Sequence, residues 1–179
     1  MTNPRFPIGE FKRPDRLSEA ERAAAIARIE ATPATLRAAV DGMSDAQLNG
    51  TYREGSWTLR QVVHHLADSH VNSYTRFRLA LTEDHPTIKP YDENKWAALD
   101  DARTMPVEVS LKMLEALHAR WAALLRSLHA EDFNRTIDHP ENGTMTIDQL
   151  LAMYAWHGDH HIAHINLARH GKSRSQSAE

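Results

Sequence analysis

Four of the ten residues in the segment WHGDHHIAHI (residues 156–165) are histidines. A helix turns by about 100° per residue, so His157 and His161 project side by side, one turn apart. On a helical wheel these two lie within the apolar stripe, whereas His164 lies at its margin and His160 on its flank. Two inward imidazoles at this spacing can share one metal ion, and we expect a metal site here. Two separately hydrogen-bonded core histidines are the alternative.

A third ligand has to come from another helix, and the segment VVHHLADSH (residues 62–70) is the evident source. On its wheel His70 points near the centre of the apolar arc, His65 lies at the edge, and His64 lies slightly further out. Periodicity alone therefore favours His70 or leaves the choice open.

Composition sets the frame for such a site. A chain of 179 residues suits one domain, and 41% hydrophobic residues, 25% charged residues and a net charge of −3 are typical of soluble globular proteins. No basic stripe points to nucleic acid, and no apolar run is long enough to cross a membrane. The N-terminus lacks the apolar segment of a secretory signal, and cysteine is absent, so we expect a cytoplasmic protein.

Helix start signals divide the chain. Residues 1–16 contain three prolines and should form an extended arm. The first helix should run from Ser18 to about Met43, with a kink or a break into two helices at Pro33. Four capping boxes mark helix starts, namely Ser18 with Glu21, Ser44 with Gln47, Thr58 with Gln61, and Thr146 with Gln149.

The second helix should end near Thr82, and the third should start at Pro106. The long connection between them, residues 83–104, is expected to cover the mouth of the metal pocket as a lid. Asn142-Gly143 predicts a small hairpin, and the last helix should end near His170, with residues 171–179 as a disordered tail. The sequence thus predicts an all-α protein, an antiparallel four-helix bundle over residues 17–170.

Two motifs together resemble a known family. They are W-T-x-R-x-V-V-H-H-L-A-D-S-H (residues 57–70) and W-H-x-x-H-H-I-A-H-I (residues 156–165), and the match extends to P-I-G-E, N-S-Y-x-R-F and P-Y-D-E, at residues 7–10, 72–77 and 90–93. The chain is similar to the DinB-like superfamily, and most to its YfiT-like branch of metal-dependent hydrolases.

The resemblance implies a four-helix bundle that holds one divalent metal through three histidines. The family pattern takes the histidine before the leucine in the second helix, here His65, and the last-helix pair His157 and His161. His70 and His164 then become core residues or groups that support the ligands. The resemblance also implies a homodimer.

Three neutral imidazoles leave the ion its full charge and at least one open position, which is the composition of a catalytic site. We expect zinc first and nickel second. The function expected is hydrolysis of a small-molecule substrate. The alternatives are transfer of a low-molecular-weight thiol to an electrophile, and metal binding without catalysis.

Other polar residues are candidates for supporting roles. Asp68, one turn beyond His65, could orient a ligand or act as a base. Glu54, Tyr91 and Arg76 could contact the substrate, with a structural role as the alternative for each. Glu115 with His118 reads as E-x-x-H, a component of di-iron bundles. We do not expect such a site, because the last helix contains no glutamate.

Overall fold

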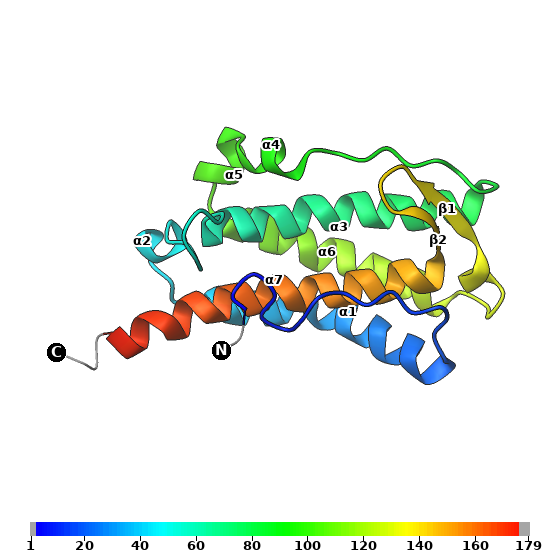
Figure 1. The fold of residues 1–179 in the computed structure, drawn as a ribbon, viewed down its shortest axis with the longest axis horizontal. Helices are drawn as coiled ribbons and strands as arrows, with labels where there is room; N and C mark the ends of the chain where they lie inside the picture. The colour runs from blue at the N-terminus through cyan, green and yellow to red at the C-terminus, as the bar shows by residue number, and fades with distance from the viewer. Residues whose placement is uncertain (1–2, 176–179) are drawn as a thin grey trace.

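Four long helices and a small hairpin make up the protein in the computed structural model (Figure 1). The structure describes the backbone of residues 3–175 and the side chains of residues 3–169. The long helices are α1 (Glu19–Val40), α3 (Leu59–Thr82), α6 (Val107–Arg126) and α7 (Ile147–Ser175). The predicted all-α class and four-helix bundle are confirmed. The short elements are α2 (Asp45–Leu48), α4 (Glu93–Ala97), α5 (Asp100–Thr104), the 3₁₀ helix η1 (Asp132–Asn134), β1 (Thr136–His139) and β2 (Gly143–Thr146).

Capping explains where these helices begin. Ser18, Ser44 and Thr58 each accept a hydrogen bond from the backbone three residues on, and Glu21, Gln47 and Gln61 bond back to the cap. Thr146 and Gln149 exchange the same two bonds before α7. Such a box satisfies two backbone N–H groups that a helix start leaves without partners. All four predicted boxes are confirmed.

Two helix ends differ from the prediction. The first helix ends at Val40 and runs without a break through Pro33, so two abutting helices are ruled out. The last helix continues to Ser175, so Gly171 does not end it. Positions 176–179 of the predicted tail lie outside the described residues. The division into arm, bundle and tail remains a prediction.

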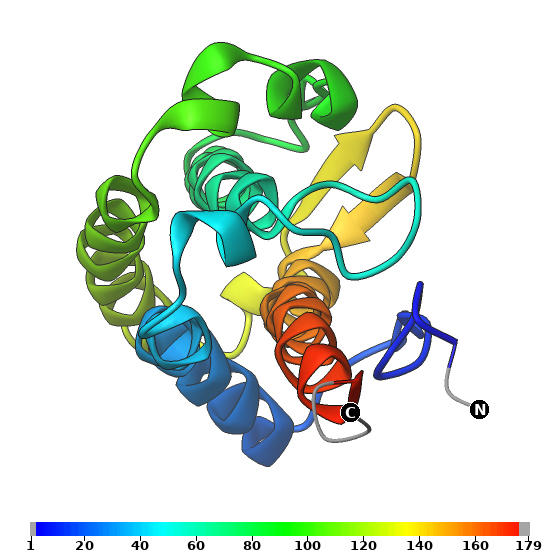
Figure 2. The same ribbon diagram turned by 90° about the vertical axis from the view of Figure 1, so that its left-hand side faces the viewer.

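The four long helices form a ring in the order α1, α6, α3, α7, with α1 and α3 on one diagonal (Figure 2). The sequence predicted antiparallel packing, which holds for α1 with α6 and for α3 with α7. The neighbours α1 and α7 run parallel, as do α3 and α6 (Figure 1). The cause is the connection after Thr82, which returns along the bundle before α6 begins. This connection contains α4 and α5, two helices that the sequence did not indicate.

The predicted hairpin closes one end of the bundle. β1 and β2 pair antiparallel, with Ile137 opposite Met145, and Gly143 adopts a positive φ of 71° beside Asn142. Both Ile137 and Met145 are fully buried, so the hairpin caps the apolar interior at this end.

A layer of histidines divides the core. Towards the hairpin, an apolar cluster contains Ile29, Phe77, Trp121 and Leu151. Towards α2, a second cluster contains Leu36, Leu66, Leu114 and Ile165. In sequence the gap between the two clusters is occupied by His70 on α3, by His118 on α6, and by His157, His160 and His161 on α7.

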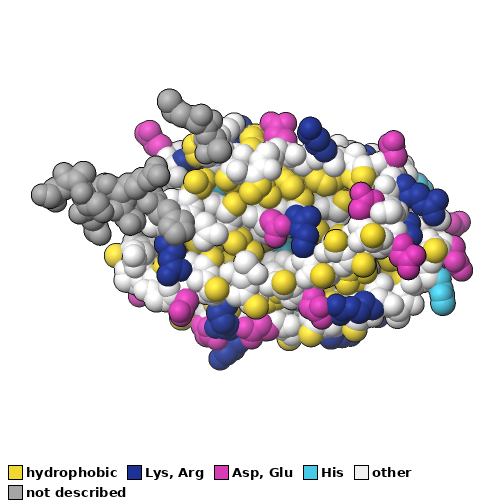
Figure 3. All heavy atoms as spheres, turned by 90° about the horizontal axis from the view of Figure 1, so that it is seen from below, with side chains coloured by type: hydrophobic (Ala, Val, Ile, Leu, Met, Phe, Trp, Pro, Cys, Tyr) yellow, Lys and Arg dark blue, Asp and Glu magenta, His cyan; other side chains and the backbone are white. Residues whose placement is uncertain are grey.

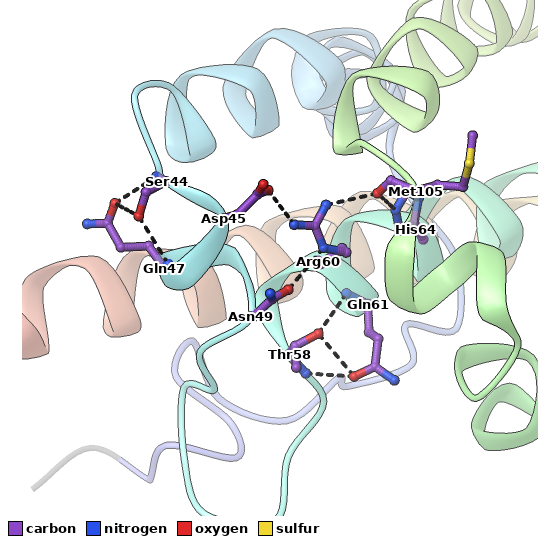
Figure 4. A network of polar contacts seen from close by, with 9 residues as sticks. All are labelled: Ser44, Asp45, Gln47, Asn49, Thr58, Arg60, Gln61, His64 and Met105. Atoms are coloured by element: carbon purple, nitrogen blue, oxygen red, sulfur yellow. Dashed lines mark hydrogen bonds and ion pairs between the residues drawn. The ribbon is translucent and has the colours of Figure 1, made fainter.

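The end of the bundle near α2 is tied by a polar network (Figure 4). The guanidinium of Arg60, buried on α3, donates to Asp45, to Asn49 and to the carbonyl of Met105. The same carbonyl accepts from Nε2 of His64, whose Nδ1 lies 2.7 Å from Ser110 Oγ. Both ring nitrogens of His64 are therefore used in hydrogen bonds that hold α3 against the start of α6.

The N-terminal arm lies along α7 and runs against its direction (Figure 1). The backbone N–H of Leu17 donates to Asp148, and Phe11 packs on Trp156 with ring centroids 5.8 Å apart. Arg22 makes two hydrogen bonds to the same Asp148, in a buried ion pair. The arm is thereby fixed along the outside of α7, the helix that carries His157, His160, His161 and His164.

The surface carries mixed charges, and the described helices are unsuited to crossing a membrane. Seen from below the view of Figure 1, side chains of both charge signs are interspersed with apolar ones (Figure 3). Within the described part of the chain, every helix is too short or too polar to traverse a lipid bilayer.

Candidate metal centre

The structure brings His65, His157 and His161 together. One ring nitrogen from each lies within 4.8 Å of the others, although His65 belongs to α3 and the other two to α7. Nε2 of His65 is 3.3 Å from Nε2 of His157. Two nitrogens bound tetrahedrally to zinc at about 2.0–2.1 Å would be separated by about 3.3 Å. The spacing of this pair therefore fits a shared ion.

Local sequence explains the close approach of the helices around this cluster. Gly158 follows His157 on α7, and a Cβ atom there would lie 2.9 Å from Oγ1 of Thr32 on α1. Any larger residue at this position would force the Thr32 side chain or one of the two helices to move. On the other side α3 runs antiparallel to α7, which places His65 across from both α7 histidines.

All three imidazoles are held in the neutral form. Burial lowers the pKa of His65 to about 4. Burial, and then the neighbouring histidines, hold the pKa values of His157 and His161 well below the ordinary range. A neutral imidazole is the form that binds a metal, so burial prepares the cluster for an ion at neutral pH. Nδ1 of His161 is buried and lacks a hydrogen-bond partner among the described residues.

Two further histidines lie directly behind the cluster. Nδ1 of His157 is 3.2 Å from Nε2 of His70, and Nδ1 of His70 is 2.8 Å from Nε2 of His118. Nδ1 of His118 donates to the carbonyl of Ile29 on α1, at 2.5 Å. His70 and His118 are 0% and 1% exposed. The sequence pointed to His70 as a core or supporting residue, whereas the contact of His118 was not foreseen.

His118 appeared in the sequence only as part of the E-x-x-H motif. In the structure Glu115 faces outward, where it pairs with Arg37 at 2.7 Å and remains about half exposed. The two residues of the motif therefore do not converge on one site.

Two further histidines of α7 are more buried than the wheel predicted. His160 and His164, placed on the flank and at the margin of the stripe, are only 7% and 2% exposed. His160 stacks on Trp156 and packs against Phe6, and Nε2 of His164 donates to the carbonyl of Arg5. The N-terminal arm thus covers this flank, which periodicity within a single helix does not reveal.

A cavity of about 270 Å³ opens beside the cluster. His161 lines it, so the candidate ligands and the cavity are continuous. Asn94 is the residue of the 83–104 connection that reaches the lining, while Arg5 and Phe6 contribute from the arm. The lid role of 83–104 remains a prediction.

The predicted supporting residues lie elsewhere. Asp68 is half-buried, and burial together with Asp101 raises its pKa to about 6. Among the described residues, its carboxylate has no hydrogen bond to the three histidines. The side chain that is hydrogen-bonded to a candidate ligand is His70 instead, whose Nε2 pairs with Nδ1 of His157.

The proposed substrate contacts are also outside the lining of this cavity. Arg76 is buried and donates to the hydroxyl of Tyr154 at 2.8 Å. The ring of Tyr91 packs against Trp96, and burial raises the pKa of its hydroxyl. Glu54 is exposed. Arg76 and the ring of Tyr91 thus have contacts within the fold, and a substrate role for these residues remains a prediction.

Comparison with known proteins gives consistent relatives. The sequence profile of the DinB superfamily matches residues 28–165. A protein of Oceanobacillus iheyensis named "Putative metal-dependent hydrolase" is 48% identical over 163 residues, which are 91% of this chain and 94% of the relative. A protein of Bacillus cereus with the same name is 50% identical over 169 residues, covering 94% and 97%.

Solved structures agree with the fold. YfiT from Bacillus subtilis, described as a "probable metal-dependent hydrolase with an unusual four-helix bundle topology", superimposes with a TM-score of 0.92 at 47% identity, over 96% of this chain and 99% of YfiT. Another four-helix bundle protein, 22% identical with a TM-score of 0.54, shares the fold.

Proposed function

The chain belongs to the DinB superfamily, and from this premise we propose that it is a metal-dependent hydrolase whose ion is bound by His65, His157 and His161. The observation that carries the proposal is the convergence of three neutral imidazoles from two helices beside a cavity. The names of the relatives support the same function.

The donor set indicates both the metal and the chemistry. Imidazole nitrogens suit zinc or nickel, and we propose zinc first and nickel second. A divalent ion bound by three neutral ligands would act as a Lewis acid and lower the pKa of water from about 15.7 to near 7. The protein contributes the arrangement of His65 on α3 against the α7 pair, and a cavity that brings a substrate next to His161.

The lining of the cavity indicates the charge of the substrate. Arg5 and Arg53 both line it, and among the described lining residues there is no aspartate or glutamate. Nε of Arg53 is buried without a partner in the described structure. A small molecule with a carboxylate or phosphate group would neutralise these cations. We therefore propose an anionic small-molecule substrate.

The test is metal analysis of the purified protein, followed by hydrolysis assays without added thiol. Pairs of esters and amides that differ only in a carboxylate would be compared, and Arg53→Ala would be assayed beside the wild type. We expect faster turnover of the anionic member, and loss of that preference in the variant. Absence of hydrolysis by the zinc-loaded or nickel-loaded protein across the panel would contradict the proposal.

Transfer of a thiol is the second candidate, and one observation favours it. Among the described residues no carboxylate lines the cavity, so the described lining offers no carboxylate base for water. A low-molecular-weight thiol has an ordinary pKa of about 8.5 and would bring its own nucleophile. Turnover that strictly requires added thiol would select this function. Metal binding without turnover under either condition would select the non-catalytic alternative.

The assembly state is a separate proposal. The homodimer implied by the family resemblance would be measured by size-exclusion chromatography with light scattering, and a single species at the mass of one 20.3 kDa chain would contradict it.

A further inference from the structure

We propose that Pro33, acting through the carbonyl of Ile29, together with His118 and His70 fixes the tautomer of His157, so that Nε2 of His157 faces the metal position without a proton. The inference rests on the proposed metal centre, but it does not depend on whether the reaction is hydrolysis. It assigns a positioning role to three residues that do not belong to the ligand set.

The carbonyl of Ile29 lacks its hydrogen-bond partner within α1. In an α-helix the carbonyl of Ile29 would accept from the N–H of the residue four positions on, which is Pro33. Proline has no backbone N–H, so this acceptor is free, although it lies within an unbroken helix. Nδ1 of His118 occupies the vacant position at 2.5 Å. Because a carbonyl only accepts, Nδ1 of His118 must carry a proton.

Burial determines how many protons His118 and His70 carry. His118 and His70 are almost fully buried, and their polar contacts are to each other, to His157 and to a carbonyl, so each ring is neutral and has a single N–H. With its proton on Nδ1, His118 offers Nε2 as an acceptor. Nδ1 of His70, at 2.8 Å, must therefore donate to it.

The tautomer of His70 sets the tautomer of His157 in the same way. His70 has its proton on Nδ1, so its Nε2 accepts from Nδ1 of His157 at 3.2 Å. The proton of His157 is thereby placed on Nδ1, and its Nε2 has a free lone pair. That nitrogen is the one that lies 3.3 Å from Nε2 of His65. One carbonyl on α1 thus determines the orientation of three imidazoles from three helices.

Fixing the tautomer should strengthen metal binding. A ligand whose second nitrogen already donates to an acceptor has its ring held in place, and its basicity raised, before the ion arrives. Loss of such a supporting hydrogen bond typically weakens metal affinity by about 10–100-fold. His161 provides the internal contrast, because its Nδ1 has no partner among the described residues.

The direct test is nitrogen-15 NMR of the metal-free wild-type protein with labelled histidine. The chemical shifts of the two ring nitrogens distinguish the tautomers. We expect His118, His70 and His157 each to be the Nδ1–H tautomer, with no averaging between forms. A proton on Nε2 of His157, or averaged shifts for this residue, would overturn the proposal. This measurement needs a variant only for assignment of the signals.

The second test compares His118→Phe with His118→Gln. Phenylalanine keeps the planar bulk but removes both hydrogen bonds, whereas glutamine keeps one donor and one acceptor on a planar group. Zinc affinity, measured by competition with a chelator, should fall by about tenfold in the Phe variant and return towards wild type in the Gln variant. In the Phe variant the shifts of His157 should become averaged.

Each outcome decides between the two proposals. Wild-type zinc affinity with an unchanged His157 tautomer in folded His118→Phe would overturn the inference, as would equal losses in both folded variants. If the wild type shows the expected tautomers but binds neither zinc nor nickel, the proposed function fails while the hydrogen-bonded chain stands. If His118→Phe does not fold, the wild-type tautomers alone decide.

Discussion

His157 and His161 are one turn apart on the same helix, yet their surroundings differ. At His157, hydrogen bonds lead inward through His70 and His118 to a backbone carbonyl on α1. The side at His161 faces the cavity, and its second nitrogen has no partner in the described structure. The bundle thus contains an anchored inner half and an open outer half.

The difference separates two tasks that a metal site has to combine. Ligand geometry is best held by buried hydrogen bonds, because each imidazole then has one orientation. Exchange of substrate and product needs an accessible side and groups that can change partners. In this protein the inner half is placed between two apolar clusters, whereas the outer half is covered by the N-terminal arm, the loop at residues 51–57 and Asn94 of α4.

The largest effect should come from the ligands themselves. Replacing His65, His157 or His161 by alanine should reduce metal content from about one ion per chain to near zero and abolish metal-dependent activity. His160→Ala is the matched control, because His160 lies on the same helix outside the cluster and should leave the ion in place. The measurement is metal content per folded chain. Loss of the ion in His160→Ala with retention in His157→Ala would reverse the assignment.

Acid should destabilise the fold through buried histidines such as His118. Burial lowers the pKa of His118 from its ordinary value of 6.5 to about 4. Between these values the unfolded chain binds a proton that the folded chain does not. The stability contributed by the neutral ring is therefore complete above pH 6.5 and is lost as the pH falls towards 4. The loss for this residue is on the order of 3 kcal/mol in the free energy of unfolding.

Urea unfolding of the metal-free protein at several pH values measures this loss. The slope of unfolding free energy against pH should be smaller in His118→Gln, which has no ring to protonate. A wild-type free energy of unfolding that stays constant between pH 6.5 and 4 would show that the inner histidines are not neutral in the folded protein.

Contact between α1 and α7 beside the inner half can be tested at Gly158. Alanine there would place its Cβ 2.9 Å from Oγ1 of Thr32, a clash that typically costs about 1–3 kcal/mol, partly offset by about 1 kcal/mol of helix propensity. We expect a net loss of about 1 kcal/mol. Adding Thr32→Ala removes the opposing atoms and should restore stability beyond additivity. Strictly additive effects in the four-protein cycle would contradict this account.

The smallest effect should come from Asp68, which the sequence suggested as a supporting group. Burial raises the pKa of its carboxyl to about 6, so folded-state stability falls as the pH rises from 3.8 through 6. Because the carboxylate is only half-buried, solvent screens much of this cost, and Asp68→Asn should raise the free energy of unfolding at pH 7 by less than about 1 kcal/mol. Zinc affinity should be unchanged. A tenfold weaker affinity would place Asp68 in the support of the site after all.

Local signals were sufficient to predict much of this molecule from its sequence. The capping boxes, the hairpin at Asn142 and the four apolar seams are properties of short windows, so they could be read directly. The pairing of His157 with His161 also followed from one helical turn. The choice of His65 over His70 came from the family resemblance, because the helical wheel alone favoured His70 or left the choice open.

What escaped prediction depends on contacts between distant segments. The burial of His160 and His164 comes from the arm and, at His164, also from the ring of Tyr52. The arm packs on α7 from more than 130 positions away, as in the 159-residue separation between Arg5 and His164. The role of His118 needs the free carbonyl behind Pro33 on another helix. Pro33 predicted a kink. It also leaves the carbonyl four residues earlier without its helical donor, which predicts that a buried side chain donates to that carbonyl.

The separation of the candidate ligands along the chain has a consequence for folding. His65 and His157 are 92 positions apart, whereas the α7 pair is complete as soon as one helix forms. Helices form within about a microsecond, long before distant segments dock. In that interval His160 and His164, also one turn apart, can bind an ion in competition with His157 and His161. The arm covers His160 and His164 later. We therefore expect zinc present from the start of refolding to slow it, and zinc added after folding to reach the three histidines directly.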